Sequence, residues 1–161
     1  MHVKRIAMLF VISFFLVACS EGTKSKENLG EIVRIALNSI MEMDQALNHD
    51  ITFIAIDMRS FSDLDDQDKA DIVTDFKEKY NMEVMEATFE ELEEKGLYNL
   101  DTLALDGVLL SIEKITYKSS KTIILDGVKF RSGKGAIGVE CTVHYVDGNW
   151  KIKESKETWI S

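Results

Sequence analysis

The fold class of this chain is decided by AIGVECTVHYVDGNWKIKESKETWI, residues 136–160. Two runs of alternating residues flank Asp147-Gly148, a pair typical of a tight β-hairpin. Side chains alternate between the two faces of a strand, so one face of the first run is apolar. That face comprises Val139, Cys141, Val143 and Tyr145. We therefore expect two long antiparallel strands, with Cys141 as a small buried hydrophobe and Trp150 turned inward.

The strand pattern extends N-terminally from this hairpin to Gly107. Residues 108–117 alternate with a change of phase, which predicts a bulge near Glu113. Residues 122–130 form a further expected strand, bulged or interrupted at Asp126-Gly127, and residues 132–135 form a turn. The last third of the chain is thus predicted to be an antiparallel meander.

Helical patterns occupy the first part of the chain. Apolar residues at three- and four-residue spacing predict amphipathic helices over 29–48 and 66–80. Thr88 and Glu91 form a capping box for a short helix that ends before Gly96. Residues 51–58 are a short apolar run, expected as a buried strand, with a second helical segment as the alternative. Helices first and a meander last indicate a single α+β domain over 29–161, with amphipathic helices packed on the C-terminal sheet.

The ending of strand, Asp-Gly-Asn-Trp and strand resembles the end of nuclear transport factor-like, cystatin-related domains. The resemblance covers about the last third of the chain. It implies a cone-shaped sheet wrapped around N-terminal helices. Such domains serve as enzymes and as binding modules, so the resemblance implies no particular activity.

The first nineteen residues have the form of a secretory signal. Lys4 and Arg5 form a basic head, and a largely apolar run of twelve residues, 6–17, follows it. This run is shorter than the about 20 residues that a membrane-spanning helix needs. A small residue before Cys19 completes the pattern of a cleavable signal peptide.

The end of that signal, Leu16-Val17-Ala18-Cys19, resembles the lipobox of bacterial lipoproteins. The resemblance implies cleavage after Ala18 and a diacylglycerol thioether on Cys19. The two acyl chains of this group anchor a protein stably, whereas a single chain holds it only marginally. The new amino group can also be acylated. We therefore expect a signal peptide over 1–18, a lipidated cysteine with a polar tether over 19–28, and a domain on the outer side of the bacterial cell membrane.

The charge balance narrows the range of partners. The chain has 28 acidic and 19 basic residues, and two of the basic ones lie in the expected signal peptide. Such a surface repels the phosphates of nucleic acids and disfavours flat docking on anionic lipid. The acidic stretch 63–74 departs from a calcium loop, because Asp68 replaces the turn glycine and Thr74 the bidentate glutamate. We expect neither a metal nor a cofactor.

One basic cluster stands out in this acidic chain. Lys129, Arg131 and Lys134 lie beside Gly133 and Gly135. Backbone N–H groups together with lysine and arginine can hold a carboxylate or a phosphate. The alternative is that the three cations pair with surrounding carboxylates. The Gly-x-Gly-x-x-Gly spacing over 133–138 is not a dinucleotide site, because no helix follows it.

Two functions from different classes follow from these patterns. The first is a lipid-anchored binding module that engages an envelope protein, a peptide or a small anionic ligand, with its oligomeric state left open. The second is a small cavity enzyme that uses His144 with Glu140 or Asp57 as acid and base. His144 and Cys141 lie on opposite strand faces. The enzyme therefore requires the His144 face of the sheet to be the enclosed one.

Overall fold

The computed structural model describes residues 27–161, so the expected signal peptide and Cys19 lie outside the described residues. Its helices are α2 (Leu29–Glu42), the 3-10 helix η1 (Gln45–Asn48), α3 (Asp66–Tyr80) and α4 (Phe89–Glu94). Its strands are β1 (Phe53–Asp57), β2 (Glu83–Glu86), β3 (Tyr98–Asn99), β4 (Ala104–Ser119), β5 (Thr122–Ser132), β6 (Gly135–Val146) and β7 (Asn149–Ile160). No helix among these residues is long and apolar enough to span a membrane.

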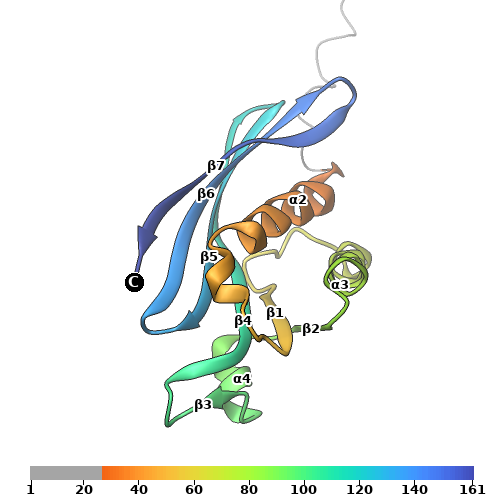
Figure 1. The fold of residues 1–161 in the computed structure, drawn as a ribbon. Helices are drawn as coiled ribbons and strands as arrows, with labels where there is room; N and C mark the ends of the chain where they lie inside the picture. The colour runs from red at the N-terminus through yellow and green to blue at the C-terminus, as the bar shows by residue number, and fades with distance from the viewer. Residues whose placement is uncertain (1–26) are drawn as a thin grey trace, which may run out of the picture.

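All of these strands belong to one sheet with the order β2-β1-β4-β5-β6-β7, and β3 pairs with β4. Strands β4 to β7 form an antiparallel meander, while β1 pairs parallel with both β2 and β4. The meander curves, and α2 lies in its hollow with α3 beside it (Figure 1). The prediction of an α+β fold with helices packed on a C-terminal meander is confirmed.

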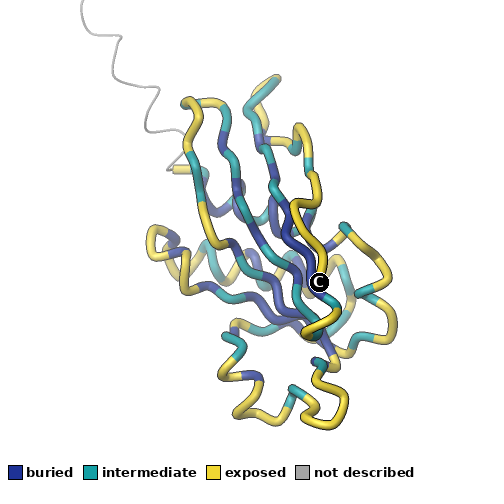
Figure 2. The backbone as a smooth tube through the Cα atoms, turned by 90° about the vertical axis from the view of Figure 1, so that its left-hand side faces the viewer, coloured by how far each residue is buried: buried dark blue, intermediate teal, exposed yellow. Residues whose placement is uncertain are grey.

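The core lies on both faces of this sheet. The larger cluster fills the space between α2, α3 and the inner face, where Ile40, Phe76 and Cys141 are buried. A smaller cluster packs α4 against the opposite face through Leu92 and Phe53. Figure 2 looks onto the outer face, where buried residues follow the strands and exposed ones mark the hairpin tips. Among the described residues, Figure 1 shows no helix over the outer face of β6 and β7.

The first helix is shorter than the apolar periodicity predicts. α2 ends at Glu42, because Met43 is extended and Asp44 is left-handed with a φ of 41°. The Asp44 side chain accepts a hydrogen bond from Ala46 N and starts η1. His49 is the C-cap of η1. The single helix expected over 29–48 is therefore wrong in its last turns.

The other helices begin where their caps predict. Asp65 caps α3 by accepting from Asp68 N, and the helix starts at Asp66 as expected. Thr88 and Glu91 form both hydrogen bonds of the capping box at α4. Gly96 follows with a φ of 70°, a conformation that glycine adopts at little cost. Local hydrogen bonds set these boundaries, which explains why the sequence predicts them.

The strands confirm most of the sequence predictions. β1 is a strand rather than a helix, and the register of β4 shifts across Glu113. The hairpin turn places Asp147 and Gly148 at positive φ. The irregularity expected at Asp126-Gly127 is wrong, because β5 pairs continuously with β6 through both residues. Gly127 serves packing instead: a Cβ there would lie 2.5 Å from Ile40 Cδ1 and 2.7 Å from Ser111 O.

Candidate functional site

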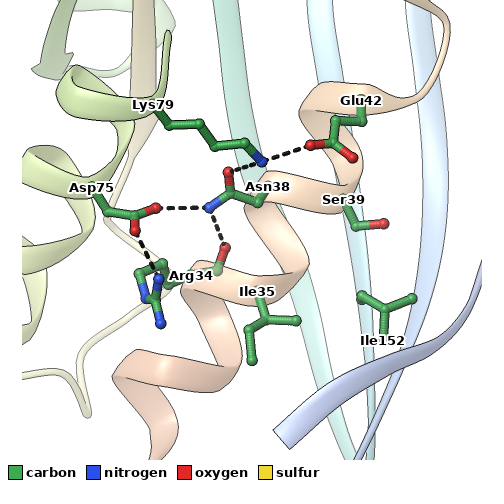
Figure 3. Close-up of a pocket in the computed structure, with 8 residues that line it drawn as sticks. All are labelled: Arg34, Ile35, Asn38, Ser39, Glu42, Asp75, Lys79 and Ile152. Atoms are coloured by element: carbon green, nitrogen blue, oxygen red, sulfur yellow. Dashed lines mark hydrogen bonds and ion pairs between the residues drawn. The ribbon is translucent and has the colours of Figure 1, made fainter.

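An open groove of about 420 Å³ lies between α2, α3 and β7 (Figure 3). α2 contributes residues at four-residue spacing, and α3 contributes two more at the same spacing, because side chains so spaced share a helix face. β7 contributes one apolar residue. The lining comprises Arg34, Ile35, Asn38, Ser39, Glu42, Asp75, Lys79 and Ile152.

Asn38 is the centre of the polar network in this groove. Its Nδ2 donates to Asp75 Oδ2 and to Arg34 O, each at 3.0 Å. Its Oδ1 accepts from Lys79 Nζ at 2.9 Å and from Tyr80 Oη at 3.2 Å. These four contacts use both donors of the amide and both lone pairs of its oxygen, so they fix its orientation.

Two ion pairs extend the network along the rim. Arg34 contacts Asp75 at 2.7 Å, and Lys79 contacts Glu42 at 2.6 Å. Burial alone would lower the pKa of Lys79, but the hydrogen bond to Glu42, the interaction with Tyr80 and the charge of Glu42 together outweigh it and raise that pKa. Lys79 therefore stays charged. The rim presents positive and negative groups side by side at fixed positions.

The floor beside this rim is apolar. Ile35 and Ile152 are half-buried and face the groove from α2 and β7 (Figure 3). Ser39 Oγ and Ser155 Oγ lie 2.6 Å apart, and Ser155 Oγ also donates to Cys141 Sγ at 3.4 Å. Burial raises the pKa of the Cys141 thiol, which opposes formation of a reactive thiolate. The expectation that Cys141 is a buried hydrophobe is confirmed.

Lys129 lies in the interior rather than in a surface patch. Its side chain is fully buried, and Nζ donates to the carbonyls of Met41, Met43 and Asp44 at 3.0, 2.7 and 3.1 Å. Met41 O lies in the last turn of α2, where the helix dipole favours a cation, and Met43 and Asp44 follow that turn directly. The contacts hold the chain where it leaves the helix. The prediction that Lys129 helps to hold a carboxylate or phosphate at the surface is therefore wrong.

The other members of the expected patch lie nearby. Arg131 donates to Leu47 O at 3.3 Å and to His49 O at 2.6 Å. Lys134 is exposed at the β5–β6 turn, between Gly133 and Gly135. Anion binding at this turn stays a prediction, now carried by Arg131, Lys134 and the glycines. The strand alternation already placed Lys129 on the face of Leu125 and Gly127, which was the available signal of its burial.

The enclosed face of the sheet is the Cys141 face, because Cys141 Sγ lies 3.8 Å from Ala36 O of α2. His144 and Glu140 therefore lie on the outer face, where Lys156 Nζ is 3.2 Å from Glu140 Oε1. The cavity enzyme requires the His144 face to be enclosed, so this arrangement disfavours it.

Asp57, the alternative acid, ends β1. Arg59 holds it with a contact of 2.6 Å. Burial alone would raise the pKa of Asp57, but the hydrogen bonds and charge of Arg59 outweigh it and lower that pKa. Arg59 also reaches Glu90 of α4 at 3.6 Å. Asp57 thus remains a carboxylate that ties the loop after β1 to α4, rather than a proton donor.

The groove residues were not among the candidates chosen from the sequence. Arg34, Asn38 and Glu42 lie on the polar face of the first helix, opposite its apolar positions. Their four-residue spacing matches that of Asp75 and Lys79 on α3, and this was the signal available. The pairing of the two helix faces is tertiary, so a single sequence does not show it.

The chain matches no protein-family model, and neither a curated protein nor a solved structure is significantly similar to it. The lipobox and the likeness to nuclear transport factor-like domains therefore stay predictions.

Proposed function

We propose that this chain is a lipid-anchored binding module of the bacterial cell envelope, and that the α2–α3–β7 groove is its ligand site. The anchor is argued from the N-terminal signal that ends in Leu16-Val17-Ala18-Cys19. A fully extended chain spans at most about 3.5 Å per residue. The tether between Cys19 and α2 would therefore hold the domain within about 35 Å of the membrane surface.

The observation that carries the binding role is the combination of a preorganised rim with an apolar floor. Each charged group of the rim is held by a neighbour, and Asn38 joins the two ion pairs. A few fixed polar groups around apolar surface are typical of ligand sites, where they set orientation and specificity. Adjacent positive and negative groups favour a ligand with both charges, such as a short peptide.

The anchor is tested by Cys19→Ala. This change removes the thiol that accepts the lipid, so the variant should leave the detergent-rich phase after temperature-induced phase separation. The unchanged protein should remain in that phase. If both proteins partition equally into detergent, the apolar run itself anchors the chain and the lipid proposal fails.

The groove is tested by titrating the chain with a pool of fluorescent tetrapeptides of random sequence. Arg34→Ala with Lys79→Ala removes both cations of the rim and should weaken binding at least tenfold. Glu78→Ala changes an exposed residue of α3 outside the groove and should leave binding unchanged. Equal binding by all three proteins, or no binding by the unchanged one, would remove the groove as a peptide site.

A further inference from the structure

β7 is an edge strand of the sheet that the described residues form, at the C-terminal end of the strand order. It is a strand of 12 residues, Asn149–Ile160, and it pairs with β6 along one side. The backbone groups on the other side of an edge strand can pair with a further strand. The opposite edge of the sheet, β2, has only four residues. β7 is thus the longer surface for strand addition.

The charges of β7 are arranged symmetrically about Ser155. Glu154 and Lys156 lie one position from it, and Lys153 and Glu157 lie two positions from it. In an antiparallel pair of two β7 strands centred on Ser155, each lysine of these pairs lies opposite a glutamate of the other copy. Opposite charges at directly opposed positions stabilise a strand pair, and like charges destabilise it.

The faces of the strand agree with this register. Glu154 and Lys156 pair with Thr142 and Glu140 of β6, so both lie on the outer face of the sheet. A shift of the centre by one residue in either direction would oppose Lys156 to Lys156 or Glu154 to Glu154. A shift of one strand by a single residue relative to the other would place side chains from different faces of the sheet opposite each other. The Ser155-centred register is therefore favoured by both charge and face.

The ends of β7 supply apolar contacts in the same register. Trp159 is 44% exposed and lies against Gly138, where a Cβ would be only 2.1 Å from the indole nitrogen. Lys151 of the second copy would lie opposite Trp159, an arrangement suited to a cation–π contact. Ile160 is 67% exposed and would be partly covered by the strand of the second copy.

We propose that β7 pairs antiparallel with β7 of a second copy of this chain, centred on Ser155, and joins two sheets into one. Lysines and bulges on an edge strand oppose pairing with arbitrary strands. β7 has both, since its register on β6 shifts at two places. The symmetric placement of the glutamates makes the second copy the partner that neutralises those lysines. The inference rests on the folded domain and does not depend on the lipid anchor.

Cysteine cross-linking in the intact chain tests this register. Two differently tagged copies are co-expressed, one with Glu154→Cys and the other with Lys156→Cys, and treated with a mild oxidant. Both residues pair regularly with β6 on the outer face, so in the proposed pair they are directly opposed, within reach of a disulfide. A control that carries Lys151→Cys in both copies separates the thiols by eight strand positions, about 26 Å. The mixed pair should form at least fivefold more cross-linked dimer than the control.

Charge exchange gives an independent measurement. Lys153→Glu in both copies opposes two glutamates at each position and should reduce co-purification of the two tags at least fivefold. Adding Glu157→Lys to the same chains restores opposite charges and should restore co-purification. Equal cross-linking of the mixed and control pairs, or co-purification that is lost and not restored by the exchange, would overturn the proposal.

Discussion

Trp150→Ala is expected to lower the free energy of unfolding by about 3–5 kcal/mol, the usual range for removing a buried tryptophan. Trp150 is 4% exposed and belongs to the larger core cluster. Its ring centroid lies 5.3 Å from that of Tyr145, directly opposite on β6. The loss would leave a cavity beside the hairpin that closes the sheet. The shift of the urea midpoint, multiplied by the m-value, measures the change.

Trp150→Phe is the matched control. Within the described residues the indole Nε1 is buried and has no hydrogen-bond partner. Phenylalanine keeps most of the apolar contact and removes this unsatisfied donor, so the cost should fall to less than half that of alanine. A loss of under about 1 kcal/mol for Trp150→Ala would place the side chain on the surface, since exposed substitutions usually have small effects.

Lys129→Ala is the second substitution with a large expected effect, a loss of about 3 kcal/mol or more. Removal of the ammonium takes a donor from three buried or half-buried carbonyls, of which Met41 O keeps Asn48 Nδ2, and it empties a buried volume. Arg131→Ala is the matched comparison, because Arg131 also donates to carbonyls but is more exposed. Its loss should stay below about 1.5 kcal/mol. Equal effects of the two changes would mean that burial gives Lys129 no special role.

The stability of the chain should also depend on pH through Lys129. Burial lowers the pKa of Lys129 to about 8 in the folded state, from 10.5, and the charge of Asp44 only partly opposes this. Between these values the unfolded chain binds more protons, so stability rises with pH over this range. The unchanged protein should therefore gain up to about 3 kcal/mol relative to Lys129→Met between pH 7.5 and 10.5. A constant difference between the two proteins would contradict the lowered pKa.

Local chemistry decides which parts of this fold a single sequence predicts. The α4 capping box, the α3 start and the Asp147-Gly148 turn each depend on residues a few positions apart, and each was predicted correctly. The end of α2 was not predicted correctly, because the backbone there is held by Lys129, which lies on a strand distant in sequence. Gly127 resembled a bulge for the same reason: its role is to admit Ile40 from α2.

In the candidate site, too, the sequence predicts local features but not the tertiary contacts. The sequence places Arg34 and Asn38 on one polar helix face and Asp75 and Lys79 on another. It does not show that the two faces meet over Ile152 of β7. The basic cluster was visible in the sequence, but two of its members are engaged by backbone carbonyls in the fold. Composition identifies charged residues, whereas packing decides which of them remain available to a ligand.

The proposal that this chain is a lipoprotein, with its binding domain held on the outer side of the bacterial cell membrane, can be tested on the mature protein. Intact mass spectrometry of the chain extracted from membranes tests it most directly. We expect a mature chain that begins at Cys19 and carries the added mass of a diacylglyceryl group, with or without a further acyl chain. A chain that still begins at Met1, or one with an unmodified Cys19, would contradict the account.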